Sequence, residues 1–199
     1  MEALTSLATA AGLGWASGVR LYAVVFFLGL LQFFGVYHLP ENLQAAANPW
    51  VMGASGFMFA VEFLADKIPG FDSVWDAAHT FIRIPAGALL AAAAVASGDP
   101  AISIAAGILG GAAAAGSHVT KASTRALINT SPEPLSNWTA SATEDAASIG
   151  MAWTALMFPL VALGFLAVFF VAAFWLLPKI WRGVGRVLSS IRQLLGSPA

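Results

Sequence analysis

Long apolar runs separated by short polar stretches dominate the chain, and this pattern predicts transmembrane helices. The first run extends from Leu4 to Val36. At about 1.5 Å per residue such a helix would be roughly 50 Å long, which exceeds the ~30 Å hydrocarbon core of a bilayer. Glycines between residues 12 and 18 interrupt the run, and Arg20 lies near its middle. We therefore expect this segment either to tilt strongly or to break near its glycines.

Three more spans follow in the middle of the chain. We expect them to end near Ala65, near Ser97 and at His118. Asp99 and Pro100 are suited to the N-cap and the first position of the last of these helices. Between the second and third spans, the sequence of residues 66–83 is the most polar part of the first half.

The second half contains a polar loop and one more long apolar segment. Residues 129–140 hold two prolines and several hydrogen-bonding side chains, which is typical of a loop. Ser141 and Glu144 have the spacing of a capping box and predict a helix start at Ser141. The segment that begins there reaches Leu177 and is too long for one straight crossing, so we expect a kink at Pro159.

The tail, residues 178–199, differs from the transmembrane domain of residues 1–177. Its basic side chains lie largely on one side of a predicted amphipathic helix in the headgroup plane. The opposite, apolar face consists of Ile180, Trp181, Val184, Val187, Leu188, Ile191 and Leu194. The positive-inside bias places the C-terminus in the cytoplasm. Five spans then put the N-terminus outside, and put polar residues 66–83 and 119–143 together on the non-cytoplasmic side; six spans would move the N-terminus inside.

Composition supports this fold class, an all-α polytopic bundle with broken or kinked helices. Of the 199 residues, 59% are hydrophobic and only 10% are charged, whereas soluble domains carry about 25% charged residues. The net charge of −1 argues against nucleic-acid binding. The absence of cysteine excludes disulfides, thiolate catalysis and cysteine metal sites. No cofactor motif and no common catalytic motif is present.

Charged residues inside apolar segments are the candidates for chemistry. An ionised side chain deep in a span costs about 2.5–3.5 kcal/mol on insertion scales and usually faces a partner or a water-filled cavity. We predict that Arg20 is buried against an acidic partner rather than extended to the membrane surface. The partners considered are Glu62, Asp66, Glu144 and Asp145. The alternative is that these groups form ordinary structural ion pairs.

Two further groups of polar residues share helical faces. Asp72, Asp76, His79 and Arg83 form the first group, which suits an acid–imidazole pair, part of a metal site, or a helix on the membrane surface. The second group, His118, Lys121 and Arg125, suits an anion pocket together with Arg20 and Arg83, or the ordinary charged end of a span. We predict that Asp76, His79, Lys121 and Arg125 approach one another. Whether a metal is bound stays open.

Several motifs resemble those of a family of small bacterial multi-pass membrane proteins that is classified as a domain of unknown function. They are EFLADKIPGFDSVWDAAHTFIRIPAGAL (Glu62–Leu89), GVRLY (Gly18–Tyr22) and KASTRALINTSPEPLSN (Lys121–Asn137), followed by Glu144-Asp145. The resemblance covers the chain up to about Leu177. It implies a multi-pass membrane protein and carries no substrate or reaction with it. We expect the protein in the bacterial inner membrane.

Three functions remain open from the sequence. The first is a small transporter or channel-like protein with a charged site where broken helices meet. The second is a membrane-embedded enzyme acting on a lipid phosphate, with His79 or His118 as acid–base group. The third is a lipid-binding scaffold without catalysis. The expected partners are membrane lipids, an anionic headgroup or a small ion, and a second copy bound through Gly/Ala-rich helix faces.

Overall fold

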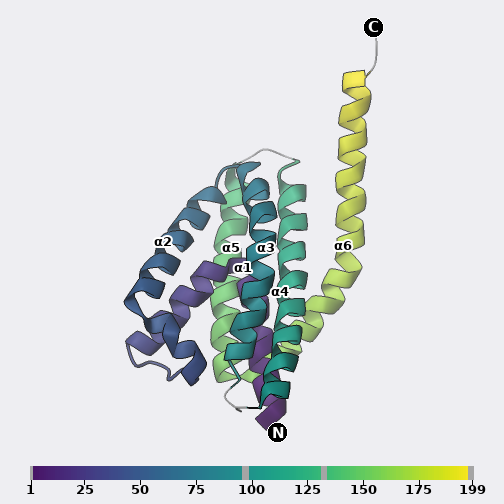
Figure 1. Cartoon of the computed structure of the whole chain (residues 1–199). Helices are drawn as coiled ribbons and strands as arrows, with labels where there is room; N and C mark the ends of the chain where they lie inside the picture. Colours follow the sequence, from purple (N-terminus) through teal and green to yellow (C-terminus); the bar gives the residue numbers. More distant parts are fainter. Residues whose placement is uncertain (1, 96–98, 131–133, 197–199) are drawn as a thin grey trace.

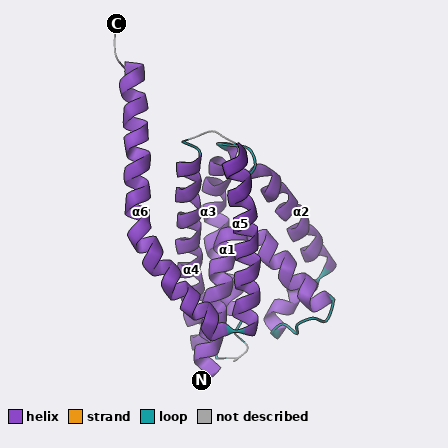
Figure 2. Cartoon of the chain, turned by 180° about the vertical axis from the view of Figure 1, so that it is seen from behind, coloured by secondary structure: helices purple, strands orange, loops and turns teal. Residues whose placement is uncertain are grey.

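The protein is a bundle of helices. The computed structural model describes residues 2–95, 99–130 and 134–196, and every regular element in these ranges is helical, as the sequence predicted (Figure 2). In chain order the elements are α1 (Glu2–Phe33), the 3-10 helix η1 (Glu41–Ala47), α2 (Pro49–Ala65), α3 (Phe71–Ala93), α4 (Pro100–Ile128), α5 (Pro134–Met157) and α6 (Pro159–Gly196).

Long apolar helices identify a membrane protein. In the described part of the chain, three helices are long and apolar enough to cross a bilayer: Glu2–Phe33, Pro100–Ile128 and Pro159–Arg186. The apolar helix α2 is shorter, with 17 residues. Helices α3 and α5 run beside these elements and carry most of the acidic residues discussed below (Figure 1).

Helix caps follow the local sequence. The side chain of Asn48 accepts a hydrogen bond from the Trp50 backbone N–H at the start of α2. Asp99 caps α4 in the same way, accepting from Ala101 N at 2.8 Å, as predicted. A turn at Pro69-Gly70 precedes α3, and Gly70 has a φ of 84°, which favours glycine.

Helix α1 is broken at Arg20, whose φ of −144° and ψ of 77° lie outside the helical region. The half before the break runs parallel to α4, because position 14 faces residue 110 and position 18 faces residue 114. The half after the break runs antiparallel to α2, since Phe26 faces Gly56 and Gly29 faces Met52. Helices α2 and α4 point the same way (Figure 1). The two halves therefore form a V that enters and leaves at one end of the bundle.

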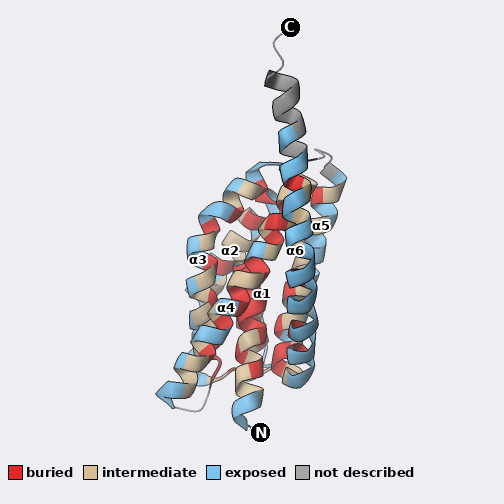
Figure 3. Cartoon of the chain, turned by 90° about the vertical axis from the view of Figure 1, so that its right-hand side faces the viewer, coloured by how far each residue is buried: buried red, intermediate tan, exposed pale blue. Residues whose placement is uncertain are grey.

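Small residues let the first half of α1 lie directly on α4. A Cβ added at Gly14 would come within 2.5 Å of the Gly110 Cα, and one at Gly18 within 2.7 Å of the Ala114 Cα. Figure 3 shows the middle of α1 as a continuously buried stretch of helix. The Gly/Ala faces expected to bind a second copy are thus used inside the chain here, and a homo-oligomer stays a prediction.

The region after α4 differs from the sequence prediction in three ways. Helix α5 begins at Pro134, so most of the expected loop 129–140 is helical, and its residues 131–133 lie outside the described residues. The capping box was therefore wrong: Ser141 lies inside α5, where its hydroxyl accepts a hydrogen bond from Arg20. The expected kinked segment is instead two helices, α5 and α6, that meet at Phe158 and run in opposite directions (Figure 1).

This reversal moves the tail to the other end of the bundle. Position 183 lies near the end of α4, because a Cβ there would be 3.9 Å from Leu127 Cδ1. Helix α6 then extends beyond the end of the bundle where the α2–α3 turn and the end of α4 lie (Figures 1 and 2). The prediction that the polar stretches lie opposite the tail was wrong.

The tail itself continues α6 to Gly196 through Pro178, without a helix break at the expected domain boundary. The side chains of Trp181, Arg182 and Arg186 are exposed, as expected for a surface helix. Four members of the expected apolar face, Val187, Leu188, Ile191 and Leu194, lie outside the described side chains.

Candidate functional site

Ten charged side chains meet inside the bundle, and we call them the ion network. They come from α1 to α5 and lie near the break in α1 and the adjacent ends of α2 and α4. The members are Arg20, Glu62, Asp66, Asp72, Asp76, Arg83, Lys121, Arg125, Glu144 and Asp145. All ten were candidates from the sequence.

Arg20 lies at the tip of the V and is fully buried. Its guanidinium is 2.7 Å from Asp66 Oδ2 and 2.9 Å from Asp145 Oδ1, with Glu144 and Glu62 at 3.4 and 3.7 Å. The predicted burial and the predicted acidic partners are both confirmed. The broken backbone at Arg20 aims this side chain at α2 and α5 together.

Lys121 occupies the centre of the ion network. Its Nζ lies 3.3 Å from Asp66 Oδ2 and Asp76 Oδ1, 3.4 Å from Glu144 Oε2 and 3.6 Å from Glu62 Oε1. It also donates a hydrogen bond to the Val19 carbonyl at 3.4 Å. The end of a helix leaves such carbonyls without partners, so Lys121 also stabilises the break in α1.

The other two cations extend the ion network along α3 and α5. Arg83 Nη2 contacts Glu62 Oε1, and its Nη1 donates to Asp76 Oδ1 at 2.7 Å. Arg125 binds Glu144 with two hydrogen bonds, from Nε at 2.8 Å and from Nη2 at 2.9 Å. Of the four residues predicted to approach one another, three do: Lys121 contacts Asp76 at 3.3 Å, and Glu144 and Asp66 bridge Lys121 and Arg125. The fourth, His79, bonds to its own helix instead.

Negative charge exceeds positive charge in the ion network. Among the described residues it holds six carboxylates and four cations, so full ionisation leaves two negative charges in excess. Glu62 Oε2, Asp66 Oδ1 and Asp76 Oδ2 are buried without a hydrogen-bond partner in the described chain. A buried ionised oxygen without a partner is costly. These three oxygens are therefore places where a proton or small cation would be stabilised.

A metal centre is not supported by the geometry. Within residues 2–95, 99–130 and 134–196, no three His, Asp or Glu side chains are grouped closely enough to hold a metal ion. The carboxylate oxygens that approach one another do so around Lys121 and the arginines. Positive side chains thus take the place that a divalent ion would need.

The two candidate histidines behave differently. His118 borders the ion network: its Nδ1 lies 3.2 Å from Arg83 Nη1 and its Nε2 lies 2.7 Å from Thr80 Oγ1. Because Arg83 can only donate, Nδ1 accepts and the proton of a neutral His118 is on Nε2. His79 instead donates from Nδ1 to the Trp75 carbonyl and stacks on the Trp75 ring. The acid–imidazole pair of Asp76 and His79, one of the three interpretations of this group, is therefore not formed among the described residues.

Sequence reasoning missed several uncharged residues that complete the site. Asn137 is fully buried and accepts a hydrogen bond from Arg125 at 3.1 Å. Its amide donates to Asn129, and Asn129 in turn donates to Asp72 Oδ1 at 2.7 Å. The sequence did offer one signal for Asn129 and Asn137, because polar side chains are rare in so apolar a chain. No spacing rule, however, connects Asn129 to Asp72.

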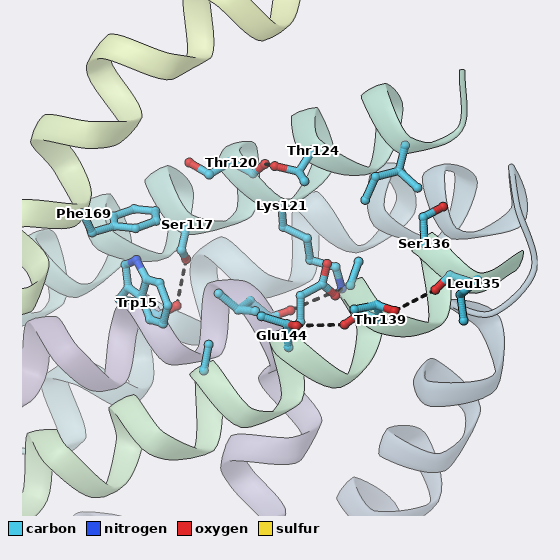
Figure 4. A pocket seen from close by; sticks show the side chains of 15 residues that line it. Trp15, Ser117, Thr120, Lys121, Thr124, Leu135, Ser136, Thr139, Glu144 and Phe169 are labelled. Carbon is cyan, nitrogen blue, oxygen red and sulfur yellow. Dashed lines mark hydrogen bonds and ion pairs between the residues drawn. The ribbon is translucent and has the colours of Figure 1, made fainter. Parts of the chain in front are cut away.

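A cavity reaches the ion network from the side. It has a volume of about 640 Å³ and lies between α1, α4 and α5, with Phe169 of α6 at one end (Figure 4). Lys121 and Glu144 form part of its wall, so the ion pair between them, 3.4 Å long, is the point of contact. Glu144 and Asp145 are the most exposed members of the network, with 14% and 15% of their side chains exposed.

Comparison with known proteins places the chain in a family without adding a reaction. The family model described as Domain of unknown function (DUF4126) matches residues 7–179, which include the whole ion network. No curated protein and no solved structure matches the chain.

Proposed function

The chain belongs to the family described as Domain of unknown function (DUF4126), and we propose that it is a small transporter whose working site is the ion network. The observation that carries this proposal is the excess of two carboxylates, buried at the break of α1. Broken helices that present their ends to a buried polar site are typical of transporters. An excess of buried negative charge favours a site that takes up protons or small cations.

The cations of the ion network argue against an anion as the primary ligand. Arg20, Arg83, Lys121 and Arg125 each contact at least two carboxylates. A phosphate headgroup would have to displace these carboxylates. The lipid-phosphate enzyme considered above is therefore less well supported than proton or cation movement.

We also propose an orientation in the membrane. Among the described residues, the basic side chains outside the ion network lie near the end that holds the α2–α3 turn and the tail: Lys67, Lys179, Arg182 and Arg186. Glu2, Glu41 and Asp99 lie toward the other end (Figure 1). By the positive-inside bias the first end is cytoplasmic. In the bacterial inner membrane, the V of α1 would then open to the outside.

Proton uptake into liposomes tests the function. Purified protein is reconstituted with the pH-sensitive dye pyranine inside, and a potassium diffusion potential, negative inside, drives proton entry. We expect uptake well above that of empty liposomes, and at least a tenfold reduction in Glu62→Gln, which removes a charge of the network. The control is Glu41→Gln, because Glu41 is exposed outside the ion network. Uptake that is equal with and without protein would refute the proposal.

A structural scaffold is the second candidate, and one observation favours it. All four buried cations are ion-paired, as they would be in a bundle held together by charges. In that case Glu62→Gln should lower the yield of folded protein. Neither the unchanged protein nor the folded fraction of the variant should then show any proton uptake. Recording folded yield beside uptake separates the two candidates.

A further inference from the structure

The cavity that reaches the ion network has walls of unusual composition. Helices α4 and α5 make few contacts with each other, and hydroxyl side chains from both helices line the space between them. The lining hydroxyls are Ser117, Thr120 and Thr124 on α4, and Ser136, Thr139 and Thr143 on α5. Figure 4 shows most of them arranged around Lys121 and Glu144.

The protons of the four threonine hydroxyls are already used. Thr120 and Thr124 donate to the carbonyls of residues 116 and 120, and Thr139 and Thr143 donate to those of residues 135 and 139, at 2.8–2.9 Å. A hydroxyl has a single proton and two lone pairs. What these side chains offer to a ligand is therefore acceptor oxygen, on two facing helices.

Electrostatics at the inner wall favours the same kind of ligand. Glu144 lines the cavity with 14% of its side chain exposed, whereas the Lys121 side chain behind it is 1% exposed. The ion network behind both carries two excess negative charges when ionised. A ligand in the cavity thus meets the Glu144 carboxylate, which Arg20, Lys121 and Arg125 contact from behind. A carboxylate has about four lone-pair sites, so it can accept from a ligand as well.

The rest of the cavity is apolar. Trp15 and Phe169 close one end with their rings 5.0 Å apart, and Ile128 and Leu135 lie toward the other. The volume of about 640 Å³ is within the range of sites for small organic ligands. An occupant therefore needs a hydrogen-bond-donating polar end and an apolar body.

From these contacts we infer that the cavity between α4 and α5 binds an amphipathic amine, with its ammonium group on Glu144 and the threonine oxygens. The apolar part of the amine lies against Trp15 and Phe169. This inference deepens the proposed function and rests on it for the step in which the bound amine is carried across the membrane. Binding itself requires no transport.

Calorimetric titration of the full-length protein in a non-ionic detergent tests the inference. Decylammonium, decanol and decanoate have matched chains and differ in the polar end. We expect decylammonium to bind at least tenfold more tightly than decanoate, with decanol between them. In Glu144→Gln the preference for the ammonium should fall below threefold. Decanoate binding as tightly as decylammonium would overturn the inference.

A second variant keeps the test decisive if Glu144→Gln does not fold. Replacing Thr139 and Thr143 together by valine removes two acceptor oxygens without changing charge, and should weaken decylammonium binding at least fivefold. The matched control is Thr154→Val, because Thr154 is on α5, donates to its own helix in the same way and lies outside this cavity. Unchanged affinity in the double variant contradicts the inference. Binding is measured in micelles and proton uptake in liposomes, so the two results are independent. A failure to bind decylammonium would not refute proton uptake, and a failure of proton uptake would not refute binding of the amine.

Discussion

Two neighbouring parts of α1 are held in the bundle by different means. Near Gly14 and Gly18 the helix lies on α4 with almost nothing between the backbones. Two residues after Gly18, at Arg20, the chain leaves the helix and the space is filled by long ionic side chains. The first contact is steric, and the second is electrostatic.

The difference teaches which part of the site can change state. Backbone atoms in close contact have no room to rearrange, because interiors are packed as densely as crystals. Ion pairs can exchange partners when a proton is gained or lost, and Lys121 already has four carboxylates within 3.6 Å. We infer that the glycine contact is the fixed support and the ion network the movable part.

Removing the arginine at the tip should have the largest effect. Arg20→Ala leaves Asp66 and Asp145 buried without their cation. Breaking one side of a buried ion pair costs about 3–5 kcal/mol, so we expect a loss of unfolding free energy of that size in mixed-micelle titrations. Arg20→Lys keeps the charge and should lose less. Equal losses for both variants would show that charge is not what holds the tip.

Adding one methyl group at the glycine contact should have the next largest effect. Gly14→Ala places a Cβ against the Gly110 backbone, and overpacking of this kind costs about 1–3 kcal/mol. The control is Gly150→Ala on α5, where nothing lies within 4 Å and helix propensity predicts a gain of up to ~1 kcal/mol. Thermal unfolding of both variants in detergent measures the contrast. A stable Gly14→Ala protein would mean that α1 and α4 are not in close contact.

A single hydrogen bond between the two helices should matter least. Ser117 Oγ donates to the Trp15 carbonyl at 2.8 Å, which joins α4 to α1. Ser117→Ala should lower the unfolding free energy by about 1 kcal/mol, the usual net value of such a bond. Ser148→Ala is the matched control, because Ser148 is equally buried but donates only within α5. If Ser117→Ala and Ser148→Ala lower the unfolding free energy by the same amount, the hydrogen bond between the two helices adds no stability of its own.

Much of the site was predictable because hydrocarbon leaves buried charges few choices. Arg20 in an apolar run had to find acids, and the four acids considered are the four that surround it. Asp72, Asp76 and Arg83 were correctly grouped, since helical spacing puts them on one face and all are buried. His79 is buried on the same face, but its ring bonds to the Trp75 carbonyl rather than to Asp76, because spacing does not say whether a ring bonds to a neighbour or to its own backbone.

Other features depended on contacts far apart in the chain. No sequence rule says that α5 and α6 reverse direction at Phe158, yet that reversal puts the tail beside Leu127. The start of α5 was missed because Pro134, which suggested a loop, is the first residue of that helix. Ser141 has the right spacing for a cap but is used by Arg20, 121 residues away.

The amino-acid order alone specified an all-helical membrane protein and the side chains that cannot remain in lipid, because solvation of single groups depends on their own chemistry. Only the tertiary structure decided where those side chains meet and which hydroxyls face a cavity. It also decided at which end of the bundle the tail lies. Those outcomes depend on the break at Arg20 and on helix direction, and both are set by contacts between residues distant in sequence.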